Sequence, residues 1–419
     1  MWFLLILFVC SYLDRINMSF AALSMNKALG LSATMFGLAN TVFYIAYVSA
    51  EIPSNMALAR FGARIWIPRI MITWGIASTA CMFAVGPNSL SALRALVGLA
   101  EAGFMPGVLL YITFWFPPAY RARAFSLFIM AQPITLMFGS SVSGLILDMN
   151  GAVGLAGWQW LFLLEGVPSV ILGIVAWFYL SDSPAKAKWL NADEKATLAH
   201  ALAHSQPQQS KPAADGRSIW RELLSAPVVL LSLTYFGVAN TLNANSTWVP
   251  QIVRAMIPDG SFTMVGLLIA IPPAITVCLM PLWCAHSDRK RERIWHFVLA
   301  LALAASGFLC IINFDAALLK FLGLIGVAVG AFSAQSIFWT MPATYLSERA
   351  RPIGFALVNT VGMLGQSVGP LIIGALKDLT QSFNLGLVYV VLVIGFSIVC
   401  ILAVSSKRVR NLQLQPDIS

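Results

Sequence analysis

Four charged residues lie within stretches of sequence that are otherwise apolar. Asp14 and Arg15 are adjacent in a run that begins at Met1, and Arg94 and Glu101 lie in another run. Each charge at a bilayer centre costs about 2.5 to 3.5 kcal/mol on insertion scales, so these side chains should face a protein interior or a watery cavity. Two cations and two carboxylates there suit the carriage of an anion together with a proton. The alternative is a structural ion pair between helices.

The spacing of the second pair places both side chains on one side of a helix. Arg94 and Glu101 are seven residues apart, which is two helical turns and about 10 Å along the axis at a rise of about 1.5 Å per residue. That face must point inward. We expect the helix to be interrupted at Pro106 and Gly107, because transporters tolerate a break where the backbone lines a cavity.

The composition is that of a membrane protein. Of the 419 residues, 59% are hydrophobic and 10% are charged, and the mean hydropathy is +0.80, which excludes a soluble globular protein. The net charge of +9 does not indicate a nucleic-acid partner, because the basic residues lie in short loops. Six cysteines without CxxC spacing and four scattered histidines predict no metal site and no cofactor.

The chain contains twelve apolar segments of a length that crosses the hydrocarbon, for which a helix needs roughly 20 residues. We predict an all-α protein with two six-helix bundles at 1–181 and 225–406, a cytoplasmic linker at 182–224 and a cytoplasmic tail at 407–419. Asn191 and Glu194 resemble a capping box and predict a short surface helix in the linker. The segments lie at about 2–24, 34–57, 65–86, 90–114, 122–147, 158–181, 226–252, 262–285, 294–314, 318–342, 353–376 and 384–405.

The basic residues predict the orientation of these segments. Most of the 26 lysines and arginines lie in alternate loops and in the tail, whereas the other side holds only Lys27, Arg254, Lys320 and Lys377. By the positive-inside rule both termini are cytoplasmic, in a multi-pass protein of the inner membrane. The first segment has no basic n-region and no cleavage site, so we interpret it as a spanning helix. It starts abruptly, which leaves open whether an N-terminal tail precedes it.

Three local patterns recur at nearly the same offset and indicate an internal duplication of about 227 residues. Each copy carries six segments, an even number, so the halves should be parallel repeats related by an axis along the membrane normal, with a site between them. The recurring pairs are Arg60 and Arg289, Arg121 and Arg349, and Gly139 and Gly365.

The two basic turns resemble the signature of the major facilitator superfamily, a Gly-x-x-x-Asp-Arg-x-Gly-Arg-Arg-like loop that occurs once in each half. The second copy, at 286–293, is the fuller one; in the first, Ala59 stands where the pattern has Asp. Other stretches resemble the anion:cation symporter family, which includes bacterial sugar-acid, tartrate and phthalate transporters and animal vesicular glutamate and sialic acid carriers. These stretches are 12–17, 51–55, 94–107, 114–117 and 162–166, with Asn359 and the Gly369-Pro370 pair.

The resemblance implies roles for the four charged residues: Asp14 and Glu101 as proton sites, and Arg15 and Arg94 as anion sites. With the site empty, the arginines can hold the carboxylates ionised. A substrate carboxylate that takes a guanidinium in bidentate fashion would leave a protein acid unpartnered, and that acid would bind a proton. Substrate and proton would then reinforce each other, as symport requires.

Polar residues on neighbouring helices resemble positions that the family uses for hydroxyl and carboxylate contacts. Each tyrosine among them is as compatible with packing as with binding, and an amide within a span needs a partner, which a neighbouring helix could also supply. Asn240, Asn243 and Asn245 rank lower, and Glu51, Glu165 and Asp148 are expected to be structural or interfacial. The candidate substrate-binding residues are Tyr12, Tyr44, Tyr47, Gln132, Ser336, Trp339 and Asn359.

We therefore expect a monomeric carrier in the lipid bilayer that imports a small organic anion with protons by alternating access. Sugar acids, tartrate-like hydroxy acids and aromatic acids all remain open as substrates. One rival is an anion exchanger or exporter of the same fold. A membrane enzyme or sensor is disfavoured, because the sequence has no His-rich membrane motif, no Gly-rich nucleotide loop in a suitable context and no soluble region beyond the linker.

Overall fold

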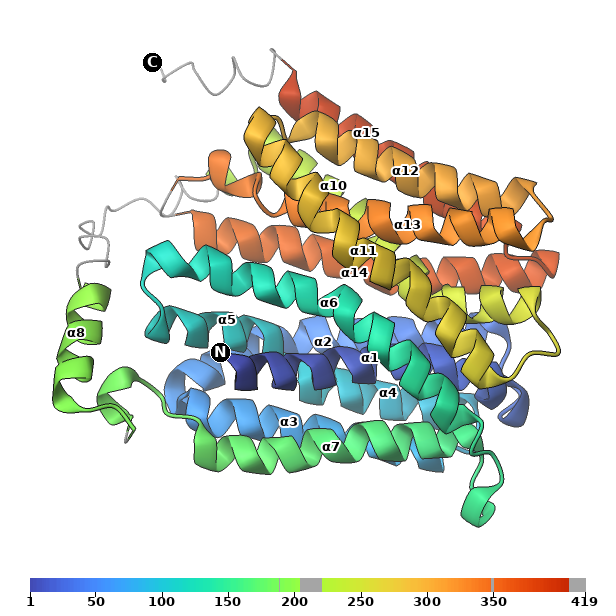
Figure 1. Ribbon diagram of the computed structural model, residues 1–419, viewed down its shortest axis with the longest axis horizontal. Helices are drawn as coiled ribbons and strands as arrows, with labels where there is room; N and C mark the ends of the chain where they lie inside the picture. Colours follow the sequence, from blue (N-terminus) through green and yellow to red (C-terminus); the bar gives the residue numbers. More distant parts are fainter. Residues whose placement is uncertain (188, 204–220, 348–349, 407–419) are drawn as a thin grey trace.

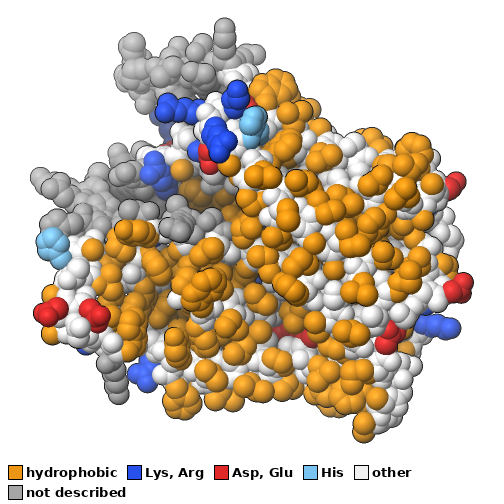
Figure 2. Space-filling model, in the orientation of Figure 1, with side chains coloured by type: hydrophobic (Ala, Val, Ile, Leu, Met, Phe, Trp, Pro, Cys, Tyr) orange, Lys and Arg blue, Asp and Glu red, His pale blue; other side chains and the backbone are white. Residues whose placement is uncertain are grey.

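The computed structural model describes residues 1–187, 189–203, 221–347 and 350–406, and almost all of them are helical. Within these ranges twelve helical segments are long and apolar enough to cross a membrane, as the sequence predicts. They form two bundles that lie side by side, the first blue to green and the second yellow to red in Figure 1. Side chains on the surface between the two ends of the molecule are largely hydrophobic, whereas charged side chains gather toward the ends (Figure 2).

The first bundle holds six spans, two of which are built from two helical pieces. In chain order the helices are α1 Trp2–Ala28, α2 Ala33–Phe61, α3 Ala63–Ala80 with η1 Cys81–Phe83, α4 Pro87–Glu101 with α5 Phe104–Trp115, α6 Pro118–Leu147 and α7 Gly157–Tyr179. A short η2, Ala152–Gly154, precedes α7.

The second bundle repeats this plan. Its helices are α10 Ala226–Met256, α11 Phe262–Lys290, α12 Ile294–Asn313, α13 Ala317–Phe338 with η4 Pro342–Thr344, α14 Arg351–Thr380 and α15 Asn384–Ser405. We call the end of the molecule where α1 begins and α15 ends the terminal face, and the other end the opposite face. On the linker, η3 Pro184–Lys186 and α8 Ala192–Ala203 lie at the terminal face (Figure 1).

The capping box predicted in the linker is formed. The Asn191 side chain accepts a hydrogen bond from the Glu194 amide at 2.8 Å, and the Glu194 carboxylate accepts one from the Asn191 amide at 2.9 Å. Two donors at the start of α8 are thereby satisfied reciprocally, which is how such a box begins a helix.

The break in the fourth span lies earlier than the sequence pattern suggests. Pro106 and Gly107 are both inside α5, whereas α4 ends at Glu101 and Gly103 adopts a left-handed φ of 84°. Proline is tolerated in the first turn of a helix, where its missing N–H has no partner to lose, so Pro106 lies in the first turn of α5 without breaking it. The expectation of a break at Pro106 and Gly107 is therefore wrong by a few residues, and Glu101 stands at the end of α4.

Glycines let the two bundles approach closely at two related places. A β-carbon on Gly37 of α2 would lie 2.3 Å from the carbonyl oxygen of Pro370 in α14, so only glycine fits there. Gly266 of α11 meets the carbonyl oxygen of Ser140 in α6 in the same way, also at 2.3 Å. Gly37 and Gly266 are 229 residues apart and Ser140 and Pro370 are 230 apart, so the two contacts are copies of one another, as a duplicated chain predicts.

An aspartate at the opposite face completes each of these two contacts. Asp378 of α14 accepts hydrogen bonds from the first amides of α2, Ala33 at 3.0 Å and Thr34 at 2.8 Å. Asp148, at the end of α6, accepts from the first amides of α11, Phe262 at 3.1 Å and Thr263 at 2.8 Å. A carboxylate is favoured at a helix N-terminus because the first amides there have no partner within the helix. We call these two contacts the twin aspartate seal.

The environment of Asp148 favours its charged form. Partial burial alone would raise the pKa of Asp148, but the hydrogen bonds from Thr263 and Phe262 and the nearby Arg254 charge outweigh it, so the pKa lies below its ordinary value. Asp148 therefore remains ionised, and its contact with α11 intact, at neutral pH.

Candidate substrate and proton site

Arg15 and Glu101 form an ion pair within the first bundle. The Arg15 Nε donates to the Glu101 carboxylate at 2.7 Å, and the Ser11 hydroxyl donates to the same oxygen at 3.1 Å. The Glu101 side chain is 1% exposed, whereas that of Arg15 is 22% exposed. Arg15 is therefore the more exposed partner of the pair, and Glu101 is the buried one. The Tyr47 ring packs on the guanidinium, 5.2 Å from ring centroid to Cζ.

Arg94 is buried without a carboxylate in contact. No described Asp or Glu lies within ion-pair distance of it, its Nε has no hydrogen-bond partner, and the residue is 3% exposed. The guanidinium instead lies over the Phe43 ring, 4.3 Å from the centroid. A desolvated cation is costly unless it is paired, and the ring face compensates for part of that cost. An anion bound at Arg94 would compensate for much more.

Asp14 lies apart from both arginines, between α1, α3 and α7. Its carboxylate accepts hydrogen bonds from the Trp74 indole, from the Ser78 hydroxyl at 2.9 Å, from the Ser169 hydroxyl at 3.0 Å and from the Asn17 amide at 3.2 Å. These donors are all neutral. Although Asp14 and Arg15 are adjacent in sequence, they point to different surroundings, because successive residues of a helix project in different directions.

Two of the three candidate tyrosines lie on α2, and one of them contacts the second bundle. Tyr44 accepts a hydrogen bond from the Asn243 amide of α10 at 3.0 Å, so it links the first bundle to the second. Tyr47 stacks on Arg15, and its hydroxyl is buried without a hydrogen-bond partner among the described residues. Tyr12 of α1 stacks against Phe8, with centroids 6.2 Å apart, and packs in the apolar clusters on that side.

The other candidates come from α6, α13, α14 and the residue that ends α13. Gln132 and Asn359 are half-buried, and no described residue forms a hydrogen bond with either amide. Ser336 donates to the Met280 sulfur at 3.3 Å, and Trp339 stacks on Phe355 and packs edge-on against Tyr235. These contacts place Trp339 in an aromatic cluster of the second bundle, and they join none of these side chains to Arg15 or Arg94.

The structure adds polar residues that the sequence pattern does not single out. Ser11, Trp74, Ser78 and Ser169 surround the two carboxylates, and Gln335, next to Ser336, is buried with an unpartnered oxygen. A serine or tryptophan in an apolar helix is common, so its type alone carries no signal. Glu165, expected to be structural, accepts from the Ser143 hydroxyl at 2.7 Å.

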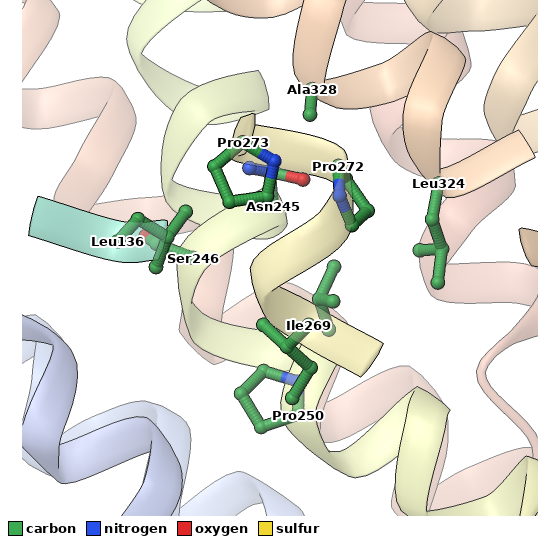
Figure 3. A pocket seen from close by; sticks show the side chains of 10 residues that line it. Leu136, Asn245, Ser246, Pro250, Ile269, Pro272, Pro273, Leu324 and Ala328 are labelled. Atoms are coloured by element: carbon green, nitrogen blue, oxygen red, sulfur yellow. The ribbon is translucent and has the colours of Figure 1, made fainter. Parts of the chain in front are cut away.

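A small cavity in the second bundle does not serve as the site. It lies between α10, α11 and α13, where Asn245, Pro272 and Pro273 face it (Figure 3). Its volume of about 10 Å³ is room for roughly one water molecule. A carboxylate substrate does not fit there. The candidate site is instead the region of Arg15, Arg94 and Tyr44, because it holds the buried cations and a contact between the bundles.

Comparisons with known proteins find relatives that match almost the whole chain. A protein of Agrobacterium vitis named "Putative tartrate transporter" is 42% identical over 98% of this chain and 93% of its own. The "Quinolone resistance transporter" of Acinetobacter baumannii is 34% identical over 97% of this chain and 93% of its own. The crystal structure of a bacterial homologue of the human lysosomal transporter Spinster, at 17% identity, superposes with a TM-score of 0.82 over 100% of this chain and 98% of that one.

The sequence profile of the Major Facilitator Superfamily matches residues 4–370, which is most of the described chain. The likeness to the solved Spinster homologue shows that the two share a fold. The chain therefore belongs to the major facilitator superfamily.

Proposed function

We propose that this protein is a proton-coupled symporter that imports a small organic carboxylate by alternating access. The observation that carries the proposal is the pairing of Arg15 with Glu101 at 2.7 Å beside a buried Arg94 that has no carboxylate in contact. One arginine already holds a protein acid, and the other is a cation that lacks its anion. The relatives named for tartrate transport support a hydroxy acid as the substrate.

Coupling follows from competition for Arg15. A substrate carboxylate that binds Arg94 and then Arg15 displaces Glu101 from the guanidinium, since bidentate binding occupies the same donors. Glu101 is 1% exposed, so its ionised form is poorly solvated once the pair is broken, and protonation relieves this. The Ser11 hydroxyl can donate to the charged acid or accept from the protonated one. Substrate binding and protonation thus favour each other.

Asp14 is the second proton site in this proposal. Hydroxyls can donate or accept, so Ser78 and Ser169 can hold the carboxylate in either charge state. No described cation is paired with Asp14, so its proton does not depend on direct displacement by the substrate. We propose that Asp14 binds a proton that is transported together with the anion, although the anion does not contact Asp14.

Contacts between the bundles support an assignment of the state. The inter-bundle hydrogen bonds of the twin aspartate seal lie at the opposite face, and those from Thr41 to Ser367 and from Asn243 to Tyr44 lie deeper along α2. If the terminal face is cytoplasmic, as the loop charges predict, this is an inward-facing state. Import then requires that the twin aspartate seal opens so that the substrate can enter.

The test is uptake of radiolabelled L-tartrate into liposomes that contain only this protein, with an inward proton gradient. Glu101→Gln should abolish accumulation above equilibrium while tartrate exchange continues, because the amide still accepts from Arg15 but does not titrate. Glu165→Gln, in a buried glutamate held by Ser143, is the matched control and should leave accumulation within about twofold. Gradient-driven accumulation that survives in Glu101→Gln would show that the coupling assignment is wrong.

One relative favours a second candidate function. The protein named for quinolone resistance is 34% identical over almost the whole chain, which is compatible with an exchanger or exporter of the same fold. In that case wild-type liposomes would exchange or release the anion without gradient-driven uptake, and Glu101→Gln would have little effect.

A further inference from the structure

A basin at the opposite face gathers all the basic residues of that side. Its volume is about 910 Å³, and the loops between α1 and α2, after α10, between α12 and α13 and between α14 and α15 line it. Lys27, Arg254, Lys320 and Lys377, the four cations that the sequence places on this side, all line it, together with Asp315 and Asp378. We call it the outer basin, and it has a surplus of two positive charges.

Both carboxylates that line the outer basin have partners. Both oxygens of Asp378 accept from the first amides of α2 in the twin aspartate seal. Asp315 pairs with Lys320 at 3.7 Å. Arg254 donates to the Gly260 carbonyl and lies over the Phe262 ring, 5.0 Å from its centroid. Lys377 has no carboxylate within ion-pair distance among the described residues, although Asp378 is next to it in the chain.

Lys377 is held in place as a fixed cation. Its Nζ donates to the Gln251 side-chain oxygen at 3.0 Å and lies 4.1 Å from the Phe383 ring centroid and 5.9 Å from that of Trp248. Because the amide oxygen of Gln251 faces the ammonium, its Nε2 is left without an acceptor among the described residues. A cation beside an unpartnered N–H group is the chemistry that binds a carboxylate.

We propose that the outer basin is an anion-collecting site in which Lys377 and Gln251 bind the carboxylate of the substrate before the halves open. This proposal rests on the proposed function for its orientation and for its class of substrate. Asn26, whose buried side-chain oxygen has no donor, also lines the basin and suits a substrate hydroxyl. The basin borders Asp378, so an anion held there lies beside the contact that must break for entry. Like-signed cations in a concave surface raise the local anion concentration and the rate of encounter.

The basin can be tested separately from transport by saturation-transfer NMR, with L-tartrate as the probe and the full chain in nanodiscs. Arg94→Gln removes the arginine at which central binding is proposed to begin and should leave a weak, salt-sensitive tartrate signal. Adding Lys377→Gln should reduce that signal at least about fivefold, whereas adding Lys186→Gln at the terminal face should not. Lys186 is a matched control because it also has a polar partner, Asp182 at 3.3 Å.

Three outcomes would overturn the proposal: no tartrate signal in Arg94→Gln, an equal signal with and without Lys377, or equal displacement by chloride at the same ionic strength. Its failure is distinguishable from failure of the proposed function. If tartrate binds in the outer basin but liposomes show no proton-driven uptake, the proposal of an anion-collecting site is supported and the proposal of proton coupling is wrong. In a transporting protein, Lys377→Gln should raise KM about three- to tenfold at low salt with little change in the maximal rate, and this difference should vanish at high salt.

Discussion

At the scale of residues, the two carboxylates of the first bundle differ in their partners. Glu101 is held by a cation, whereas Asp14 is held by four neutral donors from three helices. The sequence places both acids within spans but does not determine this difference, because two arginines and two carboxylates can pair in more than one way. Helix rotation decides it, and the rotation is set by the packing of α1 against α6 and α7, which no local pattern encodes.

The hydrogen bonds of Asp14 predict how its substitution changes the stability of the protein. Asp14→Leu would leave the buried donors of Trp74, Ser78 and Ser169 without an acceptor, and each such donor costs about 1–3 kcal/mol. Asp14→Asn keeps one acceptor oxygen and should cost much less. Thermal unfolding followed by scanning fluorimetry should therefore give a clearly lower Tm for Asp14→Leu than for Asp14→Asn. Equal melting temperatures would mean that the donors are satisfied in another way.

The candidate site was predictable in part. The residue types at Arg15, Arg94 and Glu101 suffice to predict a charged site in the first bundle. The hydrogen bond between Tyr44 and Asn243 joins a predicted residue to an asparagine that the sequence ranked lower. Ser11 and Gln335 were not predictable, because an isolated polar residue in a helix gains meaning only from the side chain that it faces.

At the scale of elements, two helix starts and two helix ends close the opposite face. Ser32 and Ser261 cap α2 and α11 through their hydroxyls, which accept from Met35 at 3.2 Å and Met264 at 3.1 Å. The aspartates of the other bundle then take the remaining first amides. Each helix start thus has one partner within its own bundle and one across the interface, and only the second is lost when the bundles separate.

Removing the aspartates should favour the opened state. A helix-capping side chain contributes about 0.5–2 kcal/mol, so the Asp148→Ala and Asp378→Ala double variant should shift the population away from the sealed state by more than either single variant. Spin labels at positions 151 and 260, in loops of the two bundles at this face, would report the change by electron–electron double resonance. Asp259→Ala removes one charge from the same face outside the seal and is the control.

An unchanged distance distribution in the double variant would mean that the glycine contacts and the deeper inter-bundle hydrogen bonds hold the face closed without the aspartates. None of those contacts involves a carboxylate, so a face closed by them would not open when the pH falls. Because the pKa of Asp148 is depressed, its contribution is present above the ordinary aspartate pKa and is lost as the pH falls through the lower value in the protein.

At the scale of the whole molecule, the twelve spans were predictable because lipid imposes them, and the duplication because local patterns recur at nearly the same offset. A run of apolar residues long enough to cross the bilayer has few alternatives to a helix, so the predicted segments match the helices closely. The break in the fourth span was misplaced because Pro106 is a strong signal in sequence but is harmless in a first turn, whereas Gly103 carries the left-handed turn.

The orientation is a prediction that labelling can check. In a variant without the native cysteines, a single cysteine at position 151, in the loop before α7, should react with an impermeant maleimide added to intact cells. A cysteine at position 291, between α11 and α12, should react only after lysis, because the terminal face is expected to be cytoplasmic. The reverse pattern would also reverse the proposed inward-facing assignment.

The twin aspartate seal is reciprocal, so few residues in each half are needed to close the opposite face. Each half offers one acid and one serine-started helix, and each acid meets the helix of the other half. An interface in which the same patch on both partners is self-complementary is that of a twofold homodimer. A single unit of six helices already holds both components of the twin aspartate seal. Two identical copies facing each other would therefore form the same contacts without any further residue.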